Sequence, residues 1–103
     1  MDGFTKRLHT LMGETGFTVS DLARFLRVPR PTTNTWLNGR VPFGPKLKNA
    51  EERIALLERS LKKRSEYYPV PANLSWPKRV EYVQGMRDDA ERNHSVPNMR
   101  AAG

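Results

Sequence analysis

Apolar residues recur every three or four positions along most of the chain, and this spacing predicts helices with little β structure. The first amphipathic helix is expected over about residues 3–13, ended by Gly13 and Gly16. A second helix is expected to begin after a capping hydroxyl, Thr18 or Ser20, and to end near Arg27. The Val28-Pro29 pair that follows forces a turn. These elements predict an N-terminal half built from short, closely spaced helices.

Three more helices are predicted after the turn. A short polar helix starts at Arg30 or Pro31, because proline suits the first helical turn, and stops at Gly39. The strongest helix covers about residues 46–64, and a last helix covers 75–92. The long helix has a narrow apolar seam typical of helix pairing, formed by Leu47, Ala50, Ile54, Leu57 and Leu61.

With 103 residues, the chain is expected to form one small domain with an appendage. We divide it into a helical domain over residues 1–64, a proline-rich linker over 65–74, an accessory helix over 75–92 and a disordered tail over 93–103. The predicted fold class is therefore all-α: a small bundle of about four helices, with a long fourth helix and a linked C-terminal helix.

Positive charge is concentrated in the first part of the chain. The formal net charge is +7; residues 1–64 hold 13 Lys/Arg against 6 Asp/Glu, whereas residues 65–103 hold 5 of each. Between Asp21 and Glu51 there is no acidic residue. Such a surface suits a polyanion, and an ordinary solvated basic face is the alternative.

The short polar helix has the composition of an element that enters the DNA major groove. Trp36 and Leu37 form its apolar side, and we expect Trp36 to lie in the core. Its other side chains are mostly small, polar and neutral, which lets them approach and hydrogen-bond the edges of bases. Cations surround them, and cations can contact the phosphates. The base-contact candidates are Arg30, Pro31, Asn34, Thr35 and Asn38.

The same region resembles the helix-turn-helix of lambda-repressor/Cro-like (XRE-type) DNA-binding proteins over about residues 4–60. The resemblance rests on the spacing of Val19, Ala23, Val28, Trp36, Gly39 and Pro42. It implies base contacts from the short helix and phosphate contacts from Thr18 and Ser20. In two places the chain departs from the family pattern. Arg27 stands where glycine is usual in the turn, which predicts either a strained left-handed residue or a different turn angle. Thr33 replaces an aliphatic residue and is expected to bond a carbonyl one turn back.

Further cations and hydroxyls around the short helix complete the predicted DNA surface. The phosphate-contact candidates are Thr18, Ser20, Arg24, Thr32, Arg40, Lys46 and Lys48. Dimerisation should place two reading helices about one DNA turn apart, roughly 34–36 Å. The dimer-interface candidates are Ile54, Leu57, Leu61, Trp76, Val80 and Val83.

These features predict a sequence-specific double-stranded DNA-binding protein, a homodimeric and repressor-like transcriptional regulator of phage or mobile-element type. One alternative is an oligomeric DNA-recognition subunit of a viral packaging or assembly machine. A second is a protein-interaction module that docks through Tyr67, Tyr68, Trp76 and the last helix.

Catalysis has little support in the sequence. There is no cysteine, and the only histidines, His9 and His94, lie in unrelated contexts. The acidic run from Asp88 to Glu91 lacks the geometry of a divalent-ion site, because adjacent acids on a helix point in different directions. We expect no enzyme activity, cofactor, metal or membrane association, and a location in the cytoplasm of a prokaryotic cell, free or with the nucleoid.

Overall fold

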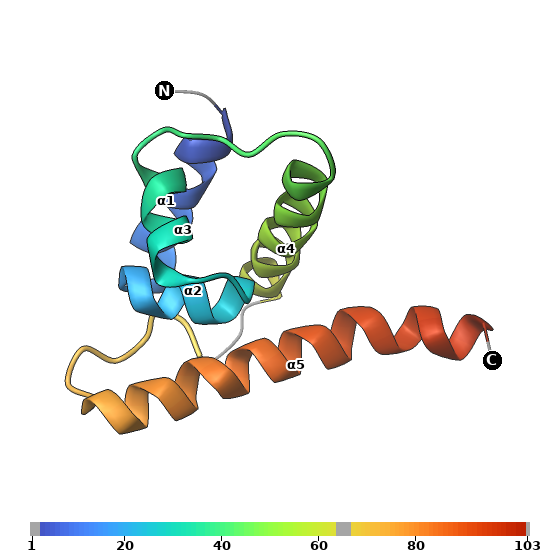
Figure 1. Ribbon diagram of the computed structural model, residues 1–103. Helices are drawn as coiled ribbons and strands as arrows, with labels where there is room; N and C mark the ends of the chain where they lie inside the picture. The colour runs from blue at the N-terminus through green and yellow to red at the C-terminus, as the bar shows by residue number, and fades with distance from the viewer. Residues whose placement is uncertain (1–2, 64–66, 103) are drawn as a thin grey trace.

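The computed structural model describes residues 3–63 and 67–102, with side chains through Arg92, and its regular structure there is entirely α-helical (Figure 1). The helices are α1 (Gly3–Thr15), α2 (Val19–Leu26), α3 (Arg30–Leu37), α4 (Pro45–Lys62) and α5 (Trp76–Ala102). In Figure 1, α1 to α4 cluster together, while α5 passes beneath α2 and its C-terminal end projects beyond the cluster. The all-α fold class is confirmed.

The core lies where the apolar sides of the first four helices meet. Leu8, Leu22 and Leu26 are buried there with Ile54 and Leu57. Burial of such side chains stabilises the fold by about 1.5–3 kcal/mol each relative to exposure. Trp36 is also buried, with its ring set edge-on to Phe4 at a centroid distance of 5.5 Å, so its predicted place in the core is confirmed.

Two helix ends differ from the prediction. Gly13 lies inside α1, which continues to Thr15 and stops at Gly16, where the left-handed φ of 75° suits glycine. The last helix does not end at Arg92 but continues to Ala102, through residues expected to form a disordered tail. Charge and low apolar content suggested that tail, but they do not prevent a helix that is already nucleated from continuing.

Residues 67–92 pack onto the N-terminal helices and are not a linker with an appended helix. Val70 is buried, and its N–H donates to the Thr15 carbonyl at 2.8 Å. The Tyr68 ring lies 6.3 Å from that of Phe17, and burial raises the pKa of the Tyr68 hydroxyl. Further along, α5 buries Val83, Met86 and Ala90 and contacts α2 and α4. The described parts of the chain therefore share one core.

This packing corrects the predicted dimer seam. Ile54, Leu57 and Val83 are fully buried within the chain and cannot face a partner. Leu61 and Val80 are half-buried, while Trp76 is 59% exposed. The seam spacing does indicate helix pairing, but the paired helices belong to the same chain. The periodicity of the apolar residues is the same whether the neighbouring helix comes from the same chain or from a partner.

Candidate nucleic-acid interface

The outer face of α3 is exposed along its whole length. Burial of Thr33, Trp36 and Leu37 fixes which side of this eight-residue helix faces inward. Pro31, Thr35 and the C-cap residue Asn38 lie on the opposite side, with Asn34 at its edge. Arg30 is the first residue of the helix and, at about 100° per residue, lies on the same side as Leu37. All five base-contact candidates are exposed. The predicted start of the helix is also confirmed, since it begins at Arg30 with a proline in its first turn.

Side chains from α1 hold the C-terminal end of α3. The Thr5 hydroxyl donates to the Trp36 carbonyl at 3.0 Å, and His9 Nε2 lies 2.9 Å from the Leu37 carbonyl, which it can approach only as a donor. At the other end, the Thr33 hydroxyl donates to the Pro29 carbonyl at 3.2 Å, as predicted. These bonds satisfy buried polar groups and fix the helix as a rigid unit.

The turn before α3 is held in a strained but well-bonded conformation. Arg27 is left-handed, with φ 61° and ψ 40°, which is the first of the two alternatives expected for a turn without glycine. Its N–H donates to the Arg24 carbonyl, and the Val28 N–H donates to the Ala23 carbonyl at 3.1 Å, which is the Schellman arrangement of a helix end. The Arg27 guanidinium donates two hydrogen bonds to the carboxylate of Glu91 in α5, each 2.8 Å long.

Four cations near α3 are free. Arg30, Arg40, Lys46 and Lys48 are exposed, and none of them pairs with a carboxylate among the residues that the structure describes. A polyanion could therefore approach them without first breaking an ion pair. Arg30 begins α3, and Arg40 and Lys46 line a pocket together with α3 residues, so these cations suit contacts to the phosphates beside a DNA groove.

Arg24, in contrast, is already engaged and does not belong with the free cations. Its guanidinium carbon lies 5.1 Å from the centre of the Trp76 ring, and Nη1 is 3.9 Å from an oxygen of the buried Asp21. Its side chain is only 21% exposed and already has these partners, so its role as a phosphate contact stays a prediction. The sequence between Asp21 and Glu51 contains no acidic residue, but the surface near Arg24 is not purely basic. Glu91 of α5 pairs with Arg27 there.

The hydroxyl candidates differ in what they can still offer. The Thr18 hydroxyl accepts from the Asp21 N–H while the Thr18 N–H donates to the Asp21 carboxylate, so the two form a capping box at the start of α2. Thr18 is exposed, and its hydroxyl can still donate to a phosphate. Ser20 and Thr32 are half-buried. The Thr35 hydroxyl donates to the Pro31 carbonyl at 2.9 Å, which leaves its methyl group and oxygen lone pairs for a ligand.

A groove of about 620 Å³ adjoins the outer face of α3. It is lined mainly by apolar groups of the α3–α4 loop, with Arg40 and Lys46 among its lining residues. Phe43 in this loop is 86% exposed, and sequence reasoning missed it because an aromatic residue between a proline and a glycine gives no periodic pattern. The groove extends the candidate interface beyond the helix itself.

Other kinds of site find no support in the described part of the chain. Residues 3–63 and 67–92 contain no cluster of three His, Asp or Glu side chains that could hold a metal ion. Among the described helices, none is both long and apolar enough to cross a membrane. No protein-family model, curated protein or solved structure matches the chain, so its function must be argued from the geometry of this interface.

Proposed function

We propose that the protein binds double-stranded DNA in a sequence-specific way, with α2 and α3 acting as a helix-turn-helix and α3 entering the major groove. The observation that carries the proposal is the exposed outer face of α3, whose side chains are short and polar. Arg30, Arg40 and Lys46 are exposed at or beside this helix, and none of them pairs with a carboxylate of the described residues. Short side chains let a helix approach base edges closely, and the surrounding cations contact phosphates.

Individual residues of α3 then have distinct roles. The Asn34 amide pairs with an adenine edge through two hydrogen bonds, and Arg30 forms a fork with guanine. Because the Thr35 hydroxyl hydrogen is bonded to Pro31, Thr35 offers its methyl group to thymine. Pro31 and Asn38 complete the contact surface at the two ends of the helix.

Phosphate contacts come from outside α3. Arg40, Lys46 and Lys48 neutralise the backbone and release counterions, which makes binding dependent on salt. The Thr18 hydroxyl and the N-terminal end of α2 add a fixed contact that sets the register on the duplex.

A single reading helix gives too little specificity for gene control, so we propose that the protein acts as a homodimeric, repressor-like regulator in the cytoplasm of a prokaryotic cell. Two copies of α3 would then occupy half-sites about 34–36 Å apart. The test begins with selection of binding sequences from a random duplex pool by the full chain. Failure to enrich any motif would favour loose binding by an oligomeric assembly protein.

Asn34→Ala tests the assignment of the reading helix. We expect it to cost about 1–3 kcal/mol on the selected sequence and to relax preference at one base pair, while binding to random duplex stays the same. Fluorescence anisotropy at two salt concentrations measures both affinities. Asn49→Ala, an equally exposed asparagine on α4, is the matched control and should change neither. An equal loss on selected and random duplexes would show that α3 does not read bases.

A further inference from the structure

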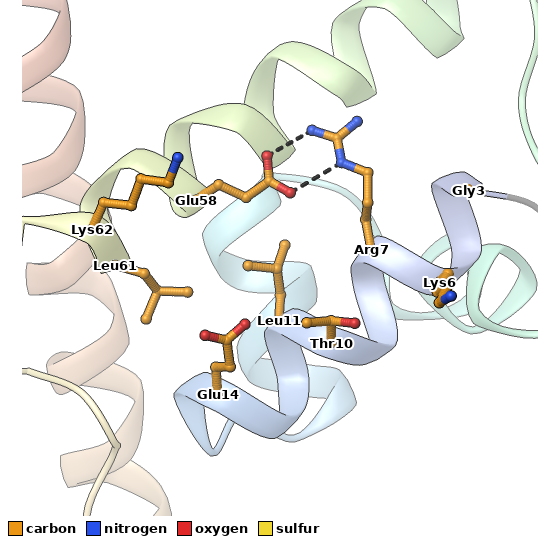
Figure 2. A pocket seen from close by; sticks show the side chains of 9 residues that line it. All are labelled: Gly3, Lys6, Arg7, Thr10, Leu11, Glu14, Glu58, Leu61 and Lys62. Carbon is orange, nitrogen blue, oxygen red and sulfur yellow. Dashed lines mark hydrogen bonds and ion pairs between the residues drawn. The ribbon is translucent and has the colours of Figure 1, made fainter.

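A second groove lies between α1 and the C-terminal half of α4, and it has a volume of about 640 Å³ (Figure 2). Leu11 of α1 and Leu61 of α4 form its apolar floor, and Glu58 of α4 holds Arg7 of α1 through two hydrogen bonds of 2.7 and 3.0 Å. Leu61 is only half-buried although its neighbours in the seam are covered. This groove is therefore an apolar surface that the described chain leaves open.

The groove faces away from the proposed DNA surface. Thr5 and His9 point from α1 toward the C-terminal end of α3. At about 100° per residue, Arg7, Thr10 and Glu14 lie on the opposite side of the same helix. A molecule bound in the groove would leave α3 uncovered.

The charges around the groove suit a protein partner better than a polyanion. The lining includes Glu14 and Glu58 as well as Lys6 and Lys62, so both signs of charge surround the groove. A phosphate backbone would be repelled by the exposed Glu14. An apolar floor with a rim of both signs is typical of protein–protein contacts.

Lys6 and Glu14 indicate which protein partner fits the groove. Both are exposed, and neither forms an ion pair among the described residues. They are about 12 Å apart along α1, at a rise of 1.5 Å per residue, so they cannot pair with each other. Both are four residues from Thr10, a small side chain in the middle of the exposed face. Two antiparallel copies of α1 that cross at Thr10 would set each Lys6 opposite the Glu14 of the other copy, and the pairing would occur twice.

We infer that this groove binds a second copy of the same chain, with α1 of the two copies antiparallel and crossing at Thr10. Leu61 of each copy packs at the edge of this contact and closes the apolar floor. The inference deepens the proposed function, on whose need for two copies it rests, by naming the surface that joins them. Its test uses no DNA, so its failure would leave base reading by α3 intact.

Sedimentation velocity of the full chain over a range of concentrations tests the inference. The wild-type protein should show a monomer–dimer equilibrium. Lys6→Glu and Glu14→Lys each replace two opposite-charge contacts by two like-charge contacts, and each should raise the dimer dissociation constant about tenfold. The double variant, Lys6→Glu with Glu14→Lys, restores opposite charges and should return the constant to within about threefold of wild type.

Matched controls separate the groove from general effects of charge. Lys78→Glu and Glu81→Lys make the same changes at exposed positions of α5 and should leave the dissociation constant unchanged. Far-UV circular dichroism confirms that each variant folds, which is expected because all four positions are exposed. A monomer at every concentration, wild-type dimerisation of both single variants, or failure of the double variant to recover would each overturn the inference.

Discussion

Replacement of Arg79 by methionine should cause a large loss of stability, although Arg79 lies far along the chain from the residues it contacts. Its Nε donates to the buried Asp21 carboxylate at 2.6 Å, and the two terminal nitrogens donate to the carbonyls of Gly16 (2.7 Å) and Pro71 (3.3 Å). The Arg79 side chain is only 13% exposed and that of Asp21 is fully buried. Arg79 therefore joins α5 to the start of α2 and to the turn before it.

The expected size of the loss follows from the charge that would remain. Without Arg79, the buried Asp21 carboxylate keeps the Thr18 N–H as its described hydrogen-bond donor and the more distant Arg24 guanidinium, 3.9 Å from its other oxygen. Removal of one partner of a buried ion pair costs about 3–5 kcal/mol. Because Thr18 and Arg24 still stabilise the carboxylate, we expect a value near the lower limit, about 3 kcal/mol, which corresponds to a fall in Tm of about 12–24 °C for a domain of this size.

Urea unfolding followed by far-UV circular dichroism measures this loss. Arg79→Met should lower the midpoint without changing the m-value. Arg92→Met is the matched control on the same helix, because the Arg92 side chain is 63% exposed and, among the described residues, pairs with Asp89 alone, so its loss should barely shift the midpoint. Adding Asp21→Asn to Arg79→Met removes the orphaned charge and should recover part of the loss. A loss below about 1 kcal/mol for Arg79→Met would refute the reasoning, because it would show that the carboxylate is not dependent on Arg79.

Two further outcomes are expected. Lys46→Ala should weaken binding to selected and random duplexes alike and reduce the salt slope by about one, measured by anisotropy at several salt concentrations; a loss confined to the selected sequence would contradict a phosphate contact. The hydrogen bonds from Arg7 lower the pKa of Glu58 below its ordinary 4.5, so their contribution to stability is complete above that pH and is lost as pH falls through the lower folded-state value. Glu58→Gln should therefore destabilise the protein at neutral pH and matter less in acid; equal destabilisation at both pH values would contradict this.

The parts of the fold that could be predicted from the sequence depend on local chemistry. Proline at the start and glycine after the end set the bounds of α3, and the departure from glycine at Arg27 marks the turn at which a left-handed residue is one of two expected outcomes. The hydrogen bond from Thr33 to a carbonyl one turn back is similarly local. Each of these features involves residues within a few positions of one another, where sequence spacing largely fixes geometry.

The parts that sequence reasoning missed depend on pairs far apart in the chain. Asp21 and Arg79 are separated by 58 positions, and Arg27 and Glu91 by 64. No periodic pattern in the sequence predicts such pairs, because each residue taken alone is typical of a charged residue on a helix surface. The apolar seam of α4 failed for a related reason: its spacing predicts a neighbouring helix but does not identify which chain supplies it.

The long-range pairs change how the turn before α3 should be understood. A left-handed residue other than glycine costs roughly 1–2 kcal/mol, and Arg27 has that conformation. Its two hydrogen bonds to Glu91 help to offset this cost, and they also fix its side chain against α5. Arg53 of α4 donates to the Leu26 carbonyl and Arg87 of α5 to that of Arg24, so cations from both long helices stabilise the C-terminal end of α2.

The C-terminal half of the chain therefore helps to set the direction in which α3 projects, together with the bonds from α1 to the end of α3. The turn joins α2 to α3 through three residues, so a change in the angle of α2 or in the conformation of Arg27 moves the whole reading face. In the described residues, that angle is fixed at one end by Arg79 on Asp21 and at the other by Glu91 on Arg27. Both contacts come from α5, so this helix helps to orient the proposed DNA-reading surface through α2 and Arg27, which lie outside α3 itself.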